Sequence, residues 1–136
     1  MNEVVSPGGA RTAFGTYGGG LRDISATDLG VIASKAALER AKLAPAKIDQ
    51  VIFGNVLQTS GDAVYFARHI GLKSVTPIEA PAITINRLCG SVLHGILLTA
   101  QEIRIAYAFY VLVSCSDQPS NTCYYNIDAR SGTPQC

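Results

Sequence analysis

Cys89 stands where a helix is expected to begin, a position at which a thiol can become a nucleophile. It lies in the segment Asn86-Arg87-Leu88-Cys89-Gly90-Ser91, directly after the apolar run 80–85. The unpaired N–H groups and the dipole of a first helical turn favour the thiolate, which is the attacking species. A helical pattern follows, with four apolar residues on one face: Leu93, Ile96, Leu97 and Ala100. The sequence therefore indicates Cys89 as a candidate nucleophile.

A buried cysteine that fills a gap between helix and sheet is the alternative interpretation, and it is the commoner role of a single cysteine. Under the nucleophile hypothesis we expect Cys89 at the N-terminus of a helix, directly after a central strand and largely buried. His94 lies five positions further on, about 140° around a helix, so we do not expect it to be the base for Cys89. A packing or surface role is more typical of such a histidine.

Strand-like and helix-like segments alternate along the chain. The sequence predicts strands at 50–53, 82–85 and 108–113, after an interrupted first strand that begins at 3–5. Ser25 or Thr27 can cap a helix that runs to about residue 42. The expected buried side of this helix is Leu29, Ile32, Ala33, Ala36 and Arg40. A second helix follows 61–62, with helical spacing at Ala63, Phe66, Ala67 and Ile70. This alternation predicts an α/β fold with a mostly parallel sheet covered by helices.

The composition is that of a soluble globular domain. The chain has 136 residues, of which 48% are hydrophobic and 15% charged, and its formal net charge is +1. This length suits one domain, and no basic cluster favours nucleic acid. The most apolar run, 105–115, is too short to cross a bilayer, and no apolar segment led by Lys or Arg opens the chain. We therefore expect a cytoplasmic protein without a secretory signal.

The cysteines and glycines do not form a second kind of site. Cys89, Cys115, Cys123 and Cys136 include no C-x-x-C pair, and neither His69 nor His94 is spaced to complete a zinc site. We expect free thiols and no bound metal. The glycine run 18–20 lacks the spacing of a phosphate-binding loop and is predicted to be flexible.

The Cys89 segment resembles the acyl-accepting cysteine segment of the thiolase family, the acetyl-CoA acetyltransferases and 3-ketoacyl-CoA thiolases. Other stretches resemble the family in the same order: 11–15 and 18–23 its opening loop, 26–30 its first helix, 54–58 the turn after its second strand, and 67–68 its second helix. The resemblance covers most of residues 1–113 without gaps. It implies a thiolase-like N-terminal half-fold, with a mostly parallel sheet and helices on both faces.

The chain departs from the family pattern at three places. Ser6-Pro7-Gly8-Gly9-Ala10 stands where the family has a buried first strand, and proline and paired glycines do not suit a strand interior. Val92 replaces a family glycine after Ser91, and 114–120 replace a glycine-rich segment. We therefore divide the chain into a thiolase-like N-terminal domain, 1–113, and a divergent tail, 114–136, that begins the family's loop region.

The resemblance implies reversible Claisen condensation of two acyl-CoA units, such as acetyl-CoA, or thiolytic cleavage of a 3-ketoacyl-CoA. Cys89 would take the acyl group as a thioester, and its backbone N–H would help to bind the oxyanion. Coenzyme A thioesters are the implied substrates, with no bound cofactor. We expect a homo-oligomer, a dimer or tetramer, without nucleic acid or membrane partners.

Other functions stay open. Family members use a histidine and a second cysteine from their C-terminal half, and His69, His94, Cys115, Cys123 and Cys136 do not match those motifs. We therefore expect the 136 residues alone to be inactive. A non-catalytic, truncated thiolase-like protein is one alternative, and an assembly module that uses an exposed sheet is another. A ketoacyl synthase is a weaker alternative because the residues around Cys89 resemble thiolases.

Overall fold

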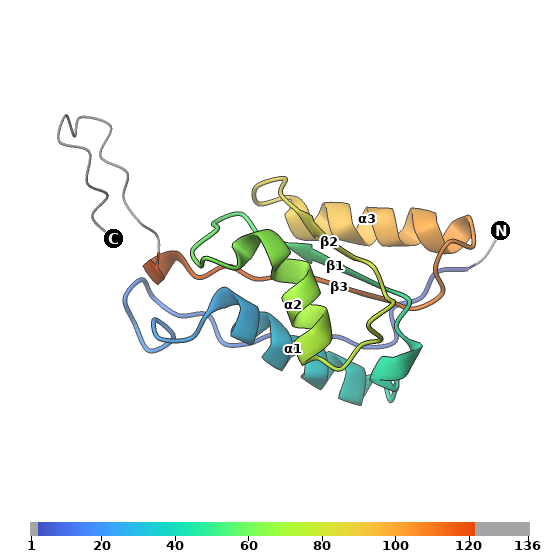
Figure 1. The fold of residues 1–136 in the computed structure, drawn as a ribbon, viewed down its shortest axis with the longest axis horizontal. Coiled ribbons are helices and arrows are strands. Elements are labelled where there is room, and N and C mark those ends of the chain that lie inside the picture. The colour runs from blue at the N-terminus through green and yellow to red at the C-terminus, as the bar shows by residue number, and fades with distance from the viewer. Residues whose placement is uncertain (1–2, 122–136) are drawn as a thin grey trace.

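The fold is built on three parallel strands in the order β2-β1-β3 (Figure 1). The computed structural model describes residues 3–121. The strands are β1 (Gln50–Gly54), β2 (Ala82–Ile85) and β3 (Val111–Cys115). Val51 of β1 is in register with Ala82 on one side and Leu112 on the other. β1 is buried over its whole length, because strands pair with both of its edges and helices cover both of its faces.

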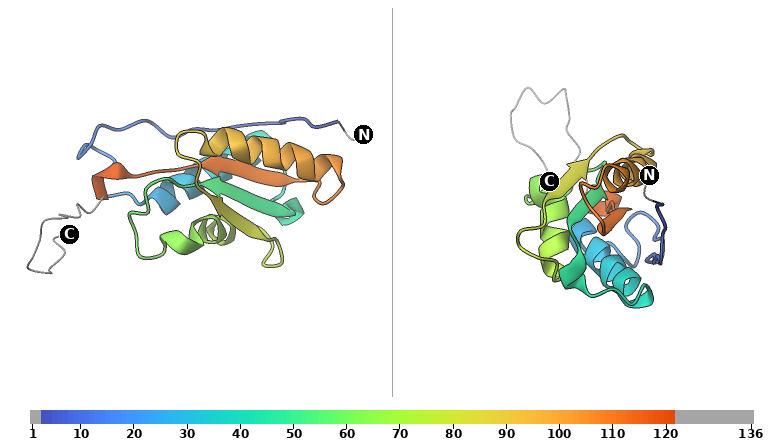
Figure 2. Two further views of the ribbon diagram at one scale, coloured as in Figure 1. Left: turned by 90° about the horizontal axis from the view of Figure 1, so that it is seen from above. Right: turned by 90° about the vertical axis from the view of Figure 1, so that its right-hand side faces the viewer.

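Helices lie on both faces of the sheet, as Figure 2 shows from two directions. α1 and α2 pack together on one face, and α3 packs on β1 and β3 from the other. The helices are α1 (Ala26–Arg40), α2 (Phe66–Lys73) and α3 (Ser91–Arg104), with short 3-10 helices η1 (Pro45–Lys47), η2 (Ala63–Tyr65) and η3 (Pro119–Asn121). The predicted α/β fold class, a parallel sheet with helices on both faces, is confirmed.

The main core lies between β1 and the α1–α2 pair. Phe53 of β1 meets Phe66 of α2 edge to face, with ring centroids 6.2 Å apart. The helical spacing predicted for the second helix is confirmed, because all four of its residues are buried: Ala63, Phe66, Ala67 and Ile70. This core fixes the position of β1, and through it the ends of all three strands.

α1 begins at Ser25, whose hydroxyl accepts a hydrogen bond from the Asp28 N–H at 3.0 Å. This is one of the two predicted caps. The predicted buried side of the helix is partly wrong, since Ile32 is 54% exposed. The residues actually buried are Ala26, Thr27, Leu29, Gly30, Val31, Ser34 and Leu38. A glycine stands on this side where α2 approaches closely: a Cβ on Gly30 would lie 2.6 Å from Ile70 Cδ1.

The apolar face predicted for the third helix is present, but it points away from the sheet. Leu93, Ile96 and Leu97 are 65%, 49% and 59% exposed. α3 instead buries its small residues, Ser91, Gly95 and Thr99. A Cβ on Gly95 would lie 2.9 Å from Val113 Cγ2, so the helix approaches the sheet through its glycine side. Hydrophobic periodicity identifies the face with large apolar side chains, whereas close packing of α3 on the sheet requires its small residues.

Each α-helix described above is followed, two residues after its last residue, by a left-handed residue that is not glycine. Lys42, Val75 and Ala106 have φ of 52°, 65° and 57°. In each case the next N–H closes the helix end: Leu43 donates to Leu38, Thr76 to Gly71, and Tyr107 to Glu102. Glycine is the usual residue here because a side chain crowds the backbone in this conformation.

The strand boundaries differ from the predictions at the two ends of the fold. β3 begins at Val111 rather than 108, because the Asp49 carboxylate binds the N–H groups of Phe109 and Tyr110 at 2.9 Å each. The interrupted first strand expected to begin at 3–5 is wrong, because residues 3–16 form neither helix nor strand. Proline and paired glycines do not suit a strand interior. The Arg40 guanidinium holds this segment beside α1 by donating to the Gly9 carbonyl at 3.0 Å.

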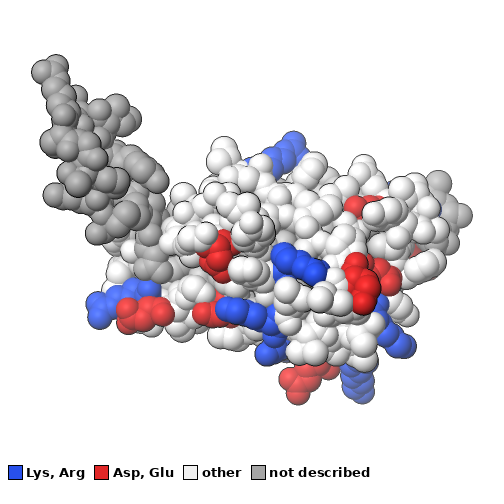
Figure 3. Space-filling view, in the orientation of Figure 1, with Lys and Arg blue, Asp and Glu red and all other residues white. Residues whose placement is uncertain are grey.

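Charged side chains of both signs gather over α1 and α2, whereas few lie over α3 (Figure 3). The apolar face of α3 and the charged face of the α1–α2 layer therefore give the domain two unlike sides. Within residues 3–121, no helix combines the length and the apolar character needed to cross a membrane.

Candidate functional site

The carboxyl ends of the three parallel strands bring the Cys89 segment, Gly54 and Cys115 to one edge of the sheet. Gly54 and Ile85 are the last residues of β1 and β2 and pair with each other. Gly54 also pairs with Cys115, at the end of β3. Parallel sheets place their ligand-binding loops at this edge. The candidate nucleophile therefore lies at the edge expected for a site.

Cys89 lies at the start of α3, one residue before Gly90, which caps the helix. The Gly90 N–H donates to the Arg87 carbonyl at 3.1 Å, which makes 87–90 a tight turn. Within this turn Leu88 has a φ of 51°, a left-handed conformation that is strained for a leucine. The predicted position is only partly met, because Cys89 lies beside the helix start but one residue before the N-cap, outside the first helical turn.

Two further expectations about Cys89 are wrong. β2 is an edge strand rather than a central one, because it pairs with β1 alone in the described part of the chain. Cys89 is exposed rather than buried. The physical reason is the same for both, since the side of the sheet beyond β2 and the outward face of α3 are uncovered in residues 3–121.

Side chains before and after the cysteine hold its turn. The Ser91 hydroxyl donates to the Leu88 carbonyl at 2.7 Å and accepts from the Arg87 N–H at 2.8 Å. The Asn86 carboxamide accepts from the Leu88 N–H at 3.1 Å and donates to the Val56 carbonyl at 3.3 Å. Sequence reasoning missed both roles, although Asn and Ser near a turn are typical of such local hydrogen bonds.

Gly54 lets the start of α3 approach the sheet. A Cβ at this position would lie 2.7 Å from Ser91 Cβ and 3.0 Å from Cys115 Cβ. Ser91 is 2% exposed, so it has little room to move away. The glycine therefore sets the distance between β1 and the Cys89 turn.

A buried polar network fixes the neighbouring loop. One oxygen of Asp117 accepts from the Val56 N–H at 2.8 Å, the Leu57 N–H at 2.9 Å and the Asn55 amide at 3.1 Å. Asn55 is 1% exposed and also donates to the Ser116 carbonyl at 3.0 Å. These contacts tie the loop after β1 to the loop after β3, beside the Cys89 segment.

The other histidine and cysteine residues considered in the sequence analysis make no described contact with Cys89. His94 is exposed, and its Nδ1 accepts from the Arg87 guanidinium at 3.3 Å. Cys115 lies at the end of β3, where burial, together with the nearby Asp117 carboxylate, raises the pKa of its thiol. Cys123 and Cys136 lie outside the described residues. No group of three or more His, Cys, Asp or Glu side chains in residues 3–121 could hold a metal ion.

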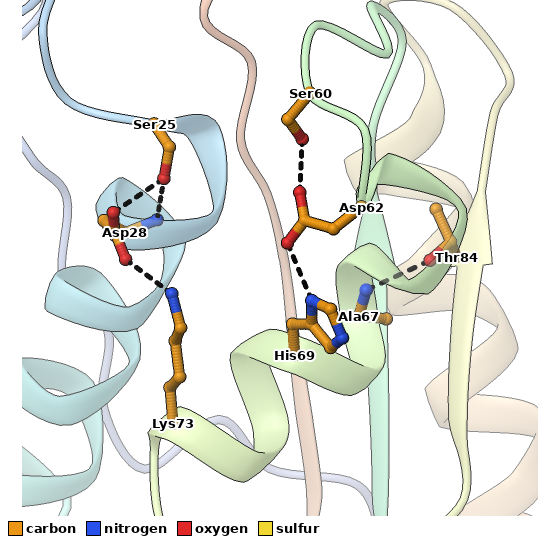
Figure 4. A network of polar contacts seen from close by, with 8 residues as sticks. All are labelled: Ser25, Asp28, Ser60, Asp62, Ala67, His69, Lys73 and Thr84. Carbon is orange, nitrogen blue, oxygen red and sulfur yellow. Dashed lines mark hydrogen bonds and ion pairs between the residues drawn. The ribbon is translucent and has the colours of Figure 1, made fainter.

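A serine, an aspartate and a histidine meet beside α2 (Figure 4). Asp62 lies between the other two: it accepts from the Ser60 hydroxyl and contacts His69 Nδ1 at 2.7 Å. The Ser60 hydroxyl and then the His69 ring hold the pKa of Asp62 below its ordinary value. In a nucleophilic triad the histidine lies between serine and acid. This arrangement therefore links the residues before η2 to α2 and does not activate Ser60.

Comparisons with known proteins bear directly on this geometry. A model of the thiolase N-terminal domain matches residues 4–135. Human mitochondrial 3-ketoacyl-CoA thiolase is 50% identical over 123 residues, which cover 90% of this chain and 31% of the human enzyme. A beta-ketothiolase of Cupriavidus necator is 38% identical over 130 residues, which cover 96% of this chain and 33% of that enzyme. This chain thus spans about a third of the length of both.

The three-dimensional comparison agrees with the sequence comparison. The crystal structure of human mitochondrial 3-ketoacyl-CoA thiolase in complex with CoA aligns with a TM-score of 0.87 and 48% identity. The alignment covers 93% of this chain and 32% of the human chain. The strand order, the helices on both faces and the helix that starts beside Cys89 are therefore those of a known fold. The chain belongs to the thiolase family, and its residues 4–135 match the model of the family's N-terminal domain.

Proposed function

We propose that this chain supplies the acyl-accepting half of a thiolase active site, with Cys89 as the nucleophile. The observation that carries the proposal is the exposed Cys89 thiol on a strained turn at the start of α3, in a chain of the thiolase family. The relatives are named as thiolases, and one solved relative is in complex with CoA. Acyl-CoA thioesters are therefore the proposed substrates.

The proposed chemistry proceeds through a thioester on Cys89. The thiolate attacks the carbonyl carbon of an acyl-CoA, the tetrahedral intermediate expels the CoA thiolate, and the acyl group stays on the sulfur. A carbanion of a second acyl-CoA then attacks this thioester to form a 3-ketoacyl-CoA and release the thiolate; thiolysis is the reverse. The backbone N–H of Cys89, beside the positive end of the α3 dipole, is the proposed donor to the oxyanion.

The complete reaction needs proton acceptors beyond those near Cys89. Both thiol attack and carbanion formation require a base within hydrogen-bond reach. His94 contacts Arg87, and His69 contacts Asp62. We therefore propose that these bases come from sequence that the longer relatives have in addition, and that the 136 residues alone do not turn over substrate.

The test measures the CoA-dependent loss of acetoacetyl-CoA absorbance by the purified chain and by Cys89→Ala, with human 3-ketoacyl-CoA thiolase as positive control. We expect no turnover by the chain, because the loss of general acid–base assistance costs about 10²–10⁴-fold in rate. Incubation with acetyl-CoA followed by peptide mapping should place any acetyl group on Cys89. Robust turnover that requires Cys89 would refute the proposed division of the site, and acetylation of Cys115 instead would refute the nucleophile.

The second candidate is a non-catalytic assembly module, and the exposed Leu93, Ile96 and Leu97 favour it. An acetyl group on Cys89 in the same experiment would favour the acyl-accepting function, because an assembly module acquires none. A homo-oligomer and a cytoplasmic location stay predictions. Sedimentation velocity tests the first, and cell fractionation tests the second against the mitochondrial location in the human relative's name.

A further inference from the structure

The amino end of the sheet, opposite Cys89, contains a buried polar side chain between β1 and α3. Gln50 is the first residue of β1 and is only 1% exposed. Its amide nitrogen donates to Glu102 Oε1, on α3, at 3.2 Å. Because the five residues of β1 rise about 3.3 Å each, this cluster lies roughly 13 Å from Gly54 and the catalytic edge.

Three buried oxygens at this place have no hydrogen-bond partner in the described part of the chain: Gln50 Oε1, Glu102 Oε2 and Thr99 Oγ1. Thr99 is 8% exposed and lies three residues before Glu102, so the two share one side of α3. The Gln50–Glu102 hydrogen bond brings the third oxygen to the same side. Buried oxygens without partners are rare and indicate a bound water or ion.

The electrostatics of the cluster favour a cation. Glu102 is in the last turn of α3, where the helix dipole is negative and a carboxylate is unfavourable. The nearby carbonyls are already used, since Tyr107 N–H donates to Glu102 and Ala106 N–H donates to Ile103. Arg104, the basic residue of this turn, is exposed. The cluster therefore presents oxygen atoms and one negative charge without an opposing positive charge among its described contacts.

We propose that Gln50, Thr99 and Glu102 ligate a monovalent cation, Na⁺ or K⁺, that stabilises the packing of α3 on β1. Amide, hydroxyl and carboxylate oxygens are the ligands of hard cations. One carboxylate balances a single positive charge, whereas calcium sites in proteins usually combine several. The proposal is independent of the function of Cys89, because the cluster lies at the other end of the strand.

The experiment compares thermal unfolding of the full chain in NaCl, KCl and choline chloride at equal ionic strength. Choline is too large for a buried site and serves as the reference cation. At about ten times the dissociation constant, a cation that binds only the folded chain raises the folding equilibrium constant about tenfold and the unfolding midpoint by roughly 3–6 °C. Sodium-23 line broadening that added K⁺ reverses would show the binding directly.

Variants locate the site. Thr99→Val and Glu102→Gln should each abolish the difference between NaCl or KCl and choline chloride. Thr27→Val is the matched control, because Thr27 Oγ1 is also buried without a partner but lies on α1, across the sheet. It should keep the full cation response. Equal unfolding midpoints of the unmodified chain in all three salts would overturn the proposal and favour bound water at these oxygens. A cation response that survives in Thr99→Val would also overturn it, because the cation would then bind elsewhere.

Discussion

Leu88 shows how one residue aims the cysteine that follows it. Its φ of 51° turns the chain sharply before Cys89, and its side chain is 68% exposed, so packing does not hold it there. The hydrogen bonds of Asn86 and Ser91 to its backbone hold it instead. Strain of this kind persists where the surroundings enforce it, and it is common at functional sites. We therefore propose that this turn positions the Cys89 thiol.

Cys89 should react before Cys115. Both cysteines are exposed, but Cys89 lies beside a helix start, whereas the raised pKa of Cys115 leaves its thiol less ionised. In a chain carrying Cys123→Ser and Cys136→Ser, limiting iodoacetamide at mildly acidic pH should label Cys89 first. Peptide mapping of the labelled chain measures the order. Earlier labelling of Cys115 would contradict the nucleophile hypothesis.

At the scale of elements, the left-handed helix ends predict a stabilising substitution. Val75 has a φ of 65° and is 69% exposed, so its side chain adds strain and little packing. Val75→Gly should raise the free energy of unfolding by about 1 kcal/mol, since a left-handed residue with a side chain costs roughly 1–2 kcal/mol and glycine gives back part of this as chain entropy. Urea unfolding measures the change.

Val64→Gly is the matched control for this substitution. Val64 is 71% exposed but lies in η2 with a negative φ. Its replacement should lower the free energy of unfolding by about 0.5–1 kcal/mol, because glycine only adds freedom to the unfolded chain. Equal changes for the two variants would show that the backbone of Val75 is not strained.

Two carboxylates at helix starts make the α1–α2 layer sensitive to acid. The Lys73 ammonium and then the Ser25 hydroxyl hold the pKa of Asp28 below its ordinary value (Figure 4). Ser60 and His69 lower the pKa of Asp62 in the same way. A carboxyl whose pKa is lower in the folded state stabilises the fold above its unfolded pKa. That stability is lost as the pH falls through the folded value, below about pH 4.

Asp28→Asn should therefore destabilise the chain at neutral pH and flatten the fall in its urea midpoint below about pH 4. Lys73→Met is the companion variant, because it removes the first partner of Asp28 and leaves Asp62 unchanged. It should flatten the same part of the curve. Curves that stay parallel to that of the unmodified chain would show that the Asp28–Lys73 pair does not contribute.

Elements were more predictable from the sequence than the faces they bury. β2 was predicted with its observed bounds, and Ser25 was one of two predicted caps, because apolar runs and capping residues act locally. The buried side of α3 was not predictable from periodicity, since Gly95 and Thr99 face the sheet while Leu93 faces outward. The helix-start position of Cys89 followed from local pattern, but its exposure depends on what covers the helix.

At the scale of the whole molecule, the outward face of α3 should make the chain self-associate. Leu93, Ile96 and Leu97 are exposed on α3, a helix over which few charged side chains lie (Figure 3). The double substitution Leu93→Lys with Leu97→Lys should lower the binding of a dye that reports exposed apolar surface. It should also lower the aggregated fraction in sedimentation velocity. Ile32→Lys is the control, because Ile32 is 54% exposed on the charged side. An equal effect of the double variant and the control would argue against self-association through the apolar face of α3.

The strand order β2-β1-β3 constrains the synthesis of the chain on the ribosome. β1 is made first, yet each of its partners arrives only after a helix has been completed. The chain between β1 and β2 must therefore close into a long loop before the first hydrogen bonds between strands can form, which slows folding. Until residue 115 has emerged, β1 has an open apolar edge that a chaperone or a second nascent chain can pair with. Chains stalled before β3 should therefore aggregate more than chains stalled well beyond it, in which β1 is paired along both of its edges.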